Sequence, residues 1–543
     1  MHAALALTPD GGGEVRVLPE EGGVPVDPRP ADAAEVAELE RSASPRWVLA
    51  DVAAMYPGLL RAGARLSRCH DVASTEALLL GAEGDAEGAA AVTAARAGAA
   101  TSAVEPAPQP SLFDDEAAPP PEAPDAEGVG AAYADQLARL ERLRERLPGL
   151  GLLVAAESAS CLAAVEMTAV GVPWDADTHD RLLAELLGPR PSSASVRPAK
   201  LQALAEEAAA ALDNPRVNLD SQVDLLRSLR RAGLPVTSTR RHELRRHDHP
   251  AVAPLVRYRE LARLHAAHGW AWRDQWVRDG RFHPEYVPGG VVSGRWATRG
   301  GGALQIPKAV RAAVVAPPGR LLVVADAGQL EPRVLAALAH DPGMISATAE
   351  GDLYAALARE ALGRPEARAE MKVALLSAMY GGGAGSPALA ALRRRFPAAL
   401  ALLETAARTG EAGGSVHSVL GRTSPPRSPD WLSGLADAVA GARSRAYGRF
   451  TRNFVIQASA ADWAAVLLAT LRLSLADLRD RGFAELVFFQ HDEVVVEVDT
   501  PLADAAVDAV RAAGATATRL VLGDTGVHVP LEARAVRSYA DRP

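Results

Sequence analysis

The pattern of hydrophobic and polar positions divides the chain into a mainly helical middle and two stretches with strand character. Residues 160–275 and 331–475 have the spacing of helices. Residues 319–328, GRLLVVADAG, form a short apolar run that stops at Asp326, as a buried strand would. Residues 486–498, LVFFQHDEVVVEV, hold two β-rich runs around three polar residues, which predicts a hairpin with acids at its turn. The pattern therefore favours a mixed α/β (α+β) fold.

Residues 84–128 interrupt this pattern. The segment is rich in Ala, Pro, Gly and acids and has few large apolar side chains, so we expect a disordered linker that does not pack. It separates a small N-terminal region of strand-like and helical pieces from the rest of the chain. At 543 residues the chain is too long for one core, which predicts about three or four domains.

Composition is that of a soluble globular protein, with 48% hydrophobic and 23% charged residues. We find no run of about 18 uncharged apolar residues and no signal peptide pattern, so we expect no membrane span. The two cysteines, Cys69 and Cys161, predict neither a disulfide framework nor a zinc site and favour a reducing cytoplasm. The net charge of −9 weakly disfavours nucleic acid as a partner, although acidic linkers can conceal a basic groove.

Two acids at strand ends form the first candidate site. Asp326 ends one strand-like run and Asp492 lies in the turn of the predicted hairpin. If these strands pair in one sheet, the two carboxylates come together, and they repel unless a divalent metal lies between them. Such a pair is the smallest frame for two-metal phosphoryl transfer. Acids at strand ends are more often turn formers or helix caps, so the pair alone is weak evidence.

The helical segment 368–380 adds two cations to this picture. Arg368, Lys372, Leu376 and Tyr380 are four positions apart and lie along one side of a helix. A triphosphate would supply the anions that such cations bind, whereas a solvated Arg/Lys edge is the simpler interpretation. Lysine is rare here: the basic residues are arginine except at Lys200, Lys308 and Lys372. Lysine can release a proton where arginine cannot, so Lys372 is either a proton donor to a leaving pyrophosphate or a simple phosphate neutraliser.

Three segments together resemble a known family. DAGQLEPR (326–333), RAEMKVALLSAMYG (368–381) and QHDE (490–493) resemble, in order and internal spacing, motifs A, B and C of the family A, polymerase I-like DNA polymerases. The segments 293–307 and 452–463 also resemble the stretches that precede motif A and motif C in that family. The resemblance covers roughly 135–543. It implies a right-hand polymerase that adds deoxynucleotides to a primer 3′-hydroxyl and releases pyrophosphate. The implied partners are primer-template DNA and dNTPs, and the implied location is cytoplasmic and nucleoid-associated.

The resemblance also implies a domain order. The N-terminal part resembles a degenerate RNase H-like 3′-5′ exonuclease domain joined to the palm, fingers and thumb of the polymerase. The implied boundaries are 1–83 for the exonuclease-like domain, 84–128 for the linker, 129–164 for the end of that domain and a connecting helix, 165–285 for the thumb, 286–340 and 455–543 for the palm, and 341–454 for the fingers.

Roles for single residues are carried over only at matching positions. The metal ligands would be Asp326, Asp492 and the carbonyl of Ala327, holding two Mg²⁺ ions (or Mn²⁺), with Glu493 as a nearby acid. The nucleotide contacts would be Gln329, Glu331, Tyr354, Arg368, Lys372, Leu376, Tyr380 and Gly381. The primer-template contacts would be Arg295, Arg449, Asn453, Gln457 and His491. Glu331 would block a ribose 2′-hydroxyl. Leu376 replaces the family's aromatic residue and Tyr354 its histidine, so sugar selection and one phosphate contact are expected to differ.

The N-terminal region departs furthest from the family. We find no Asp-x-Glu motif in its first strand, and Tyr133 stands near the place of the last catalytic Asp. Asp51, Asp71 and Asp135 are the remaining candidates for metal ligands. Because loss of a ligand removes nearly all metal-dependent activity, we expect no 3′-5′ exonuclease activity. We also see no 5′ nuclease domain.

The linker contains one short motif. QPSLFD, at 109–114, resembles the peptide that bacterial proteins insert into the sliding clamp, with Gln109, Leu112 and Phe113 as the matching residues. An apolar pair in an acidic linker has nothing local to bury it, and a segment that folds on binding would explain it.

Three other functions compete with DNA synthesis. A single-subunit RNA polymerase shares these motif types, but Glu331 and the exonuclease-like remnant disfavour it. A non-catalytic scaffold for primer ends and the clamp is disfavoured by the intact Asp326, Lys372 and Asp492. A working exonuclease with a secondary polymerase half is disfavoured by the missing acids.

Overall fold

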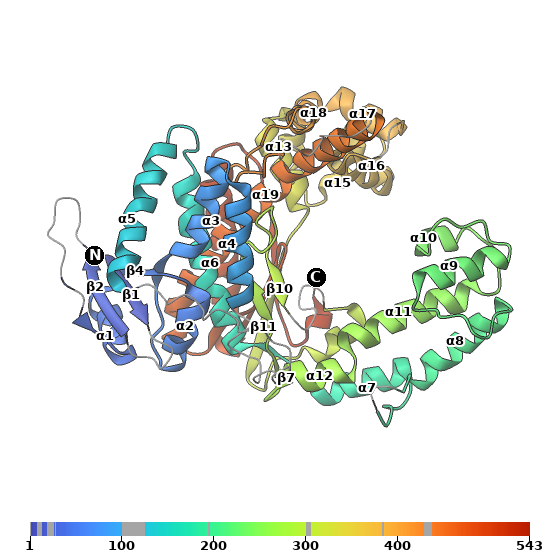
Figure 1. Cartoon of the computed structure of the whole chain (residues 1–543), viewed down its shortest axis with the longest axis horizontal. Coiled ribbons are helices and arrows are strands. Elements are labelled where there is room, and N and C mark those ends of the chain that lie inside the picture. The colour runs from blue at the N-terminus through green and yellow to red at the C-terminus, as the bar shows by residue number, and fades with distance from the viewer. Residues whose placement is uncertain are drawn as a thin grey trace.

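The computed structural model (Figure 1) describes most of the chain and shows a central sheet with one helical arm above it and another to its lower right. The described residues are 2–7, 13–18, 27, 29–99, 125–193, 196–299, 306–382, 385–427 and 437–542. The clamp-like motif, Gln109 to Phe113, lies outside them. The N-terminal α/β region packs on the opposite side of the central sheet from the helices α8 to α11 in Figure 1.

The central sheet confirms the predicted strand and hairpin. Its strands are β11 (Arg320–Ala327), β12 (Ala484–Gln490), β13 (Glu493–Asp499) and β14 (Leu531–Val536), all antiparallel, in the order β12-β13-β11-β14. The register pairs Asp326 with Glu493, so the end of β11 meets the turn of the hairpin. The two acids that the sequence placed at strand ends therefore lie at one edge of one sheet.

Alternation along β11 gives the sheet two buried faces. Val323 and Ala325 belong to a large core that includes α19 (Asp437–Arg479) and α20 (Ala503–Leu522). Leu322 and Val324 belong to a second core, which includes the helices between residues 176 and 276. Successive strand side chains point to opposite faces, so a continuous apolar run is what a strand buried on both sides requires. The sheet is thereby buried between two hydrophobic cores.

Helices make up both arms, as the sequence predicts. The upper arm in Figure 1 contains α13 (Leu330–Ala339), α14 (Pro342–Ala347), α15 (Leu353–Leu362), α16 (Arg368–Tyr380), α17 (Pro387–Arg395), α18 (Pro397–Glu411) and the start of α19. The other arm contains α7 (Ala176–Leu187), α8 (Ala199–Ala211), α9 (Gln222–Arg231), α10 (Arg241–Leu244), α11 (Val252–His268) and α12 (Trp270–Trp276).

The N-terminal region is a small mixed sheet covered by helices. Its strands are β1 (His2–Leu7), β2 (Gly13–Leu18), β3 (Arg29–Pro30), β4 (Arg46–Leu49) and β5 (Arg68–Asp71), in the order β3-β2-β1-β4-β5, with β1, β4 and β5 parallel. The helices are α1 (Ala33–Ala43), α2 (Val52–Arg61), α3 (Val72–Glu83), α5 (Ala126–Leu143) and α6 (Leu150–Val170).

One sequence expectation is wrong at the start of the linker. Residues Ala86–Ala99 form a helix, α4, rather than disordered chain, and residues 126–128 at the other end of the predicted linker already belong to α5. Arg96 on this helix donates to the sulfur of Cys161 at 3.2 Å, so the helix also packs. Alanine has the highest helix propensity of all residues, and here that preference outweighs the low content of large apolar side chains. Both cysteines are free and buried in the N-terminal core.

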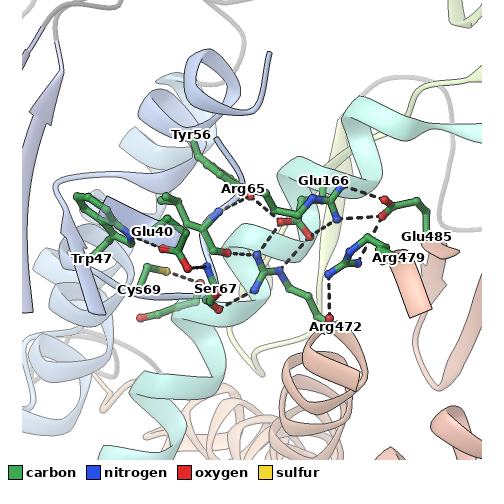
Figure 2. Close-up of polar contacts among 12 residues, drawn as sticks. Glu40, Trp47, Tyr56, Arg65, Ser67, Cys69, Glu166, Arg472, Arg479 and Glu485 are labelled. Atoms are coloured by element: carbon green, nitrogen blue, oxygen red, sulfur yellow. Dashed lines mark hydrogen bonds and ion pairs between the residues drawn. The ribbon is translucent and has the colours of Figure 1, made fainter. Parts of the chain in front are cut away.

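A buried polar network joins the N-terminal region to the central sheet (Figure 2). Arg472 on α19 donates to Glu166 on α6 at 2.6 and 2.9 Å, and to the carbonyl of Ser67 at 2.8 Å. Tyr56 donates to Glu166 at 2.6 Å. Arg65 binds Glu485 on β12 through two hydrogen bonds of 3.0 Å. The contacts tie residues far apart in sequence into one interface.

Two helices, α6 and the Val439–Arg479 stretch of α19, are long and apolar enough to cross a membrane. Of their most apolar windows, 72% and 83% respectively are buried inside the protein. Central helices of a globular fold have this composition because they are covered on all sides.

Candidate active site

The two acids meet where β11 ends against the β12–β13 turn. The backbone N–H of Ala327 donates to the carbonyl of Asp492 at 3.0 Å, so the two motif segments touch directly. His491 in the turn has a φ of 57°, a left-handed conformation that allows the tight reversal between the strands. Asp326 and Asp492 are consequently held on a rigid sheet edge rather than on a long loop.

Electrostatics at this edge favour a bound cation. Burial raises the pKa of Asp492 to about 7, and the charge of Asp326 adds to the rise. Burial and the nearby Glu493 raise the pKa of Asp326, while Arg542 opposes the rise. Among the described residues neither Asp326 nor Asp492 forms an ion pair, whereas Glu493 is buried and paired with Arg542. Two carboxylates therefore share one sheet edge, and among the described residues neither is ion-paired with a protein cation.

The donor set fits Mg²⁺ better than an all-protein metal cage. The described part of the chain contains no group of three or more His, Cys, Asp or Glu side chains that could hold a metal ion. Mg²⁺ is usually held by one or two carboxylates together with substrate phosphates and waters. The pair Asp326 and Asp492, with the backbone carbonyl of Ala327 beside it, meets that requirement.

A second cluster links the first turn after β11 to the cationic helix α16. Gln329, with a φ of 60°, donates to Asp352 at 3.1 Å and accepts from the backbone N–H of Leu353 at 2.8 Å. Arg368 forms an ion pair with the other oxygen of Asp352. Burial opposes the charged form of Asp352, but Arg368 and the backbone N–H groups of α15 lower its pKa overall. The sequence does not single out Asp352, because an acid before a helix is usually an N-cap.

The exposed side of α16 carries the predicted cations. Arg368 and Lys372 are exposed, and the charged group of each lies 5.8 Å from the ring centre of Tyr354. Met371 and Leu375, on the adjoining side of α16, are fully buried. Lys372 is held by no carboxylate in the described residues, so its charge is available to a ligand.

Glu331 connects three of the predicted contacts. It forms an ion pair with Arg295 and accepts from the hydroxyl of Tyr380 at 2.7 Å. Arg295, Glu331, His491 and Asp492 line a pocket of about 210 Å³ directly beside the acid pair. Burial lowers the pKa of His491, and the charge of Arg295 adds to the effect.

The remaining predicted contacts lie on α19 or on the last turns of α16. Gly381 ends α16 with a φ of 78°, and a Cβ there would lie 2.5 Å from Cγ of Arg449. Asn453 has a buried side-chain oxygen without a partner in the described structure. Burial raises the pKa of Tyr380, and a side-chain hydrogen bond with Gln457 acts in the opposite direction. Leu376 is partly buried on the same face as Lys372. The structure thus brings the predicted site residues from 295 to 493 into one region.

Comparison with known proteins identifies the family. A family model described as DNA polymerase family A matches residues 193–539, which is more than half of the chain. The chain belongs to the family A DNA polymerases.

Relatives and a solved structure agree with this assignment. DNA polymerase I of Chloroflexus aurantiacus is 28% identical over 310 residues, covering 52% of this chain and 32% of that protein. The thermostable DNA polymerase I of Thermus thermophilus is 27% identical over 456 residues, covering 75% and 50%. The chain therefore spans about a third to a half of the length of these relatives. The POL domain of Pol1 from M. smegmatis, in complex with DNA primer-template and dNTP, matches with a TM-score of 0.71 at 20% identity, covering 99% of this chain and 95% of that one. At this identity the match establishes the right-hand polymerase fold.

A large cavity in the described part of this family A polymerase lies away from the acid pair. It has a volume of about 800 Å³, lies between the α10–α11 arm and residues 307–309, and opens to solvent. Its basic lining residues are Arg240, Arg241, Arg257, Arg259, Arg263 and Lys308. This groove was not predicted from the sequence, because the overall charge is negative and the arginines come from separate segments. The one feature of the sequence that indicates this groove is the high density of arginine in residues 240–263.

Among the described residues, the N-terminal candidates do not all lie together. Burial, and then the nearby charge of Asp71, raise the pKa of Asp51, so these two acids are neighbours, but no group of three or more possible metal ligands includes them. Asp51 and Asp71 cap α2 and α3, accepting from Ala53 at 2.8 Å and Ser74 at 2.6 Å. Asp135 pairs with Arg139 at 3.4 Å on the surface of α5. Tyr133 is buried, with its ring centre 5.6 Å from that of His2 and 4.8 Å from that of His70. Tyr133 is therefore part of a buried aromatic cluster with His2 and His70.

Proposed function

We propose that the chain catalyses template-directed DNA synthesis, adding deoxynucleotides to a primer 3′-hydroxyl and releasing pyrophosphate. The observation that carries the proposal is the partly buried pair Asp326 and Asp492 at one sheet edge, neither of which forms an ion pair among the described residues. The cation Lys372 lies on the exposed side of α16. Acids that hold metal and cations that hold triphosphate are the two parts that phosphoryl transfer requires. Membership of family A supports the same activity.

Asp326, Asp492 and the carbonyl of Ala327 would hold two Mg²⁺ ions, or Mn²⁺. When bound, the ions stabilise the attacking and leaving oxygens of the displacement. Arg368 and Lys372 bind the triphosphate and offset the charge that develops on the leaving pyrophosphate. Lys372 in addition donates a proton to that group as its bond to the α-phosphorus breaks.

Glu331 and its partners select the sugar and test the base pair. Held by Arg295 and Tyr380, the carboxylate of Glu331 has a fixed position from which it excludes a ribose 2′-hydroxyl. This contact favours a DNA polymerase over a single-subunit RNA polymerase. Gln329 and Tyr354 complete the nucleotide site, and Leu376 leaves the sugar more space than an aromatic ring would.

Primer-template DNA would lie along the basic groove of the thumb and reach the acid pair. Arg295, Arg449, Asn453, Gln457 and His491 would track its minor groove, where acceptors are similar in all base pairs. Lys308 and the groove arginines would contact phosphates without reading sequence. In this proposal 165–285 is the thumb, 286–340 with 455–543 the palm, and 341–454 the fingers.

The N-terminal region would lack 3′-5′ exonuclease activity, because Tyr133 and its aromatic neighbours fill the place of its metal ligands. Gln109, Leu112 and Phe113 would bind the bacterial sliding clamp. A cytoplasmic, nucleoid-associated role in repair or gap filling follows from synthesis without proofreading.

The test is primer extension with labelled primer-template, Mg²⁺ and dNTPs, run beside Asp492→Ala and a reaction without dNTPs. Extension by the wild type alone is expected. Shortening of the primer without dNTPs would show a working exonuclease and refute the role given to Tyr133. Binding of DNA with neither extension nor shortening would refute catalysis and favour the scaffold.

A further inference from the structure

Arg333 is a fully buried cation next to the site, and the proposed chemistry does not use it. It lies on α13, seven positions after Asp326, and none of its surface is exposed. Burial lowers its pKa to about 10, so it remains charged at neutral pH. A buried charge without an ion pair is costly unless every donor is satisfied, and among the described residues no carboxylate forms an ion pair with Arg333.

All five N–H donors of Arg333 are bound to backbone carbonyls. Nε donates to Gly328 at 2.9 Å, and Nη1 donates to Thr348 at 2.6 Å and to His528 at 2.7 Å. Nη2 donates to Glu350 and Gly351, both at 3.1 Å. A guanidinium presents five donors in a fixed plane, so only arginine can satisfy this set.

These carbonyls belong to three separate segments. Gly328 follows the acidic end of β11, and His528 lies in the segment before β14. Thr348, Glu350 and Gly351 form the turn between α14 and α15. The hydroxyl of Thr348 also accepts from the backbone N–H of His528 at 3.1 Å. Arg333 therefore holds the turn 348–351 against the base of the palm.

The turn ends at Asp352, which orients the nucleotide site. Its carboxylate binds Gln329 and Arg368 and caps α15 at the backbone N–H of Tyr354. The ring of Tyr354 in turn lies beside the cations of α16. A displacement of the turn would move Asp352 and, with it, Arg368.

We propose that Arg333 is a positioning residue for the triphosphate subsite, acting through the turn 348–351 and Asp352. The inference rests on the proposed polymerase function. This role differs from that of a purely structural arginine, because loosening the turn weakens dNTP binding specifically rather than merely lowering the stability of the protein.

The first experiment measures KM for dNTP and kcat in primer extension. Lysine has three donors and leaves at least two of the five carbonyls unpaired, so Arg333→Lys is expected to raise KM about tenfold and change kcat by less than about threefold. Asp352→Asn is expected to raise KM similarly. If Arg333 acts through Asp352, the double variant has a KM no higher than the larger single effect. If the KM increases of the two single variants multiply in the double variant, the proposal is overturned.

Arg472→Lys is the matched control. Arg472 is nearly as buried and binds the carbonyls of Leu66 and Ser67, but it lies at the junction of Figure 2. This variant is expected to lower the melting temperature and leave KM unchanged. An unchanged KM in Arg333→Lys with a similar loss of melting temperature would make Arg333 structural and refute the proposal.

Two further measurements keep the inference testable by itself. Thr348→Val removes the hydroxyl that binds His528 and retains Arg333, and we expect a KM rise of about threefold. Hydrogen exchange of 348–355 does not depend on catalysis. We expect the amides of 348–355 to exchange faster in Arg333→Lys than in Arg472→Lys. Equal rates would overturn the proposal. This result can be read even if the wild type fails to extend primers and the proposed function is refuted.

Discussion

The ion pair between Glu166 and Arg472 gives a sharp prediction about stability. Both side chains are nearly buried, with 5% and 4% of their surface exposed. Glu166→Gln keeps the shape of the side chain and the hydrogen bond from Tyr56, but leaves the guanidinium of Arg472 buried without its counter-charge. Removing one partner of such a pair costs about 3–5 kcal/mol, whereas an exposed pair contributes little.

The assay is equilibrium unfolding in urea, followed by far-ultraviolet circular dichroism. The control is Glu141→Gln, which removes an exposed partner of Arg144 at 3.5 Å and should leave the midpoint unchanged. A loss below about 1 kcal/mol in Glu166→Gln would refute the reasoning, because it would mean that water reaches the pair.

The same pair predicts how stability depends on pH. Burial opposes the charged form of Glu166, but Arg472 and Arg65 lower its pKa below the ordinary value of 4.5. A carboxyl with a lowered folded-state pKa stabilises the protein above its unfolded pKa and loses that contribution as pH falls through the folded value. The wild type should therefore lose more stability than Glu166→Gln when the pH falls below about 4.5. Parallel loss in both proteins would contradict this assignment.

Three further predictions concern the site and the linker. Lys372→Arg keeps the charge and removes the transferable proton, so kcat should fall about a hundredfold; near-normal turnover would leave Lys372 as a phosphate neutraliser only. Gly381→Ala places a Cβ against Arg449 at a positive φ, so unfolding free energy should fall by about 1–3 kcal/mol, as urea midpoints would report; an unchanged midpoint contradicts the close contact. Replacing Leu112 and Phe113 with alanine should abolish binding to a bacterial sliding clamp in a pull-down, and unchanged binding would remove that partner.

Local sequence determined the elements that carry the chemistry. The apolar run before Asp326 and the β-rich runs around Asp492 predicted two strand ends, and the fourfold spacing of Arg368 and Lys372 predicted one helix side. These features depend on neighbouring residues only, because strand and helix periodicity is set within a few positions. The order and internal spacing of the three motifs were enough to indicate the polymerase family.

Tertiary structure decided the contacts that join distant segments. Glu166 and Arg472 are 306 positions apart, and no local pattern predicts their pairing. Asp352 has the local pattern of an ordinary helix cap and Arg333 that of one more helical cation. Only the fold places them beside the end of β11 and the cations of α16. The basic groove along α10 and α11 likewise collects arginines from separate helices, which the net charge of −9 concealed. Such contacts depend on the three-dimensional path of the whole chain, because burial and charge pairing are set by residues that only folding brings together.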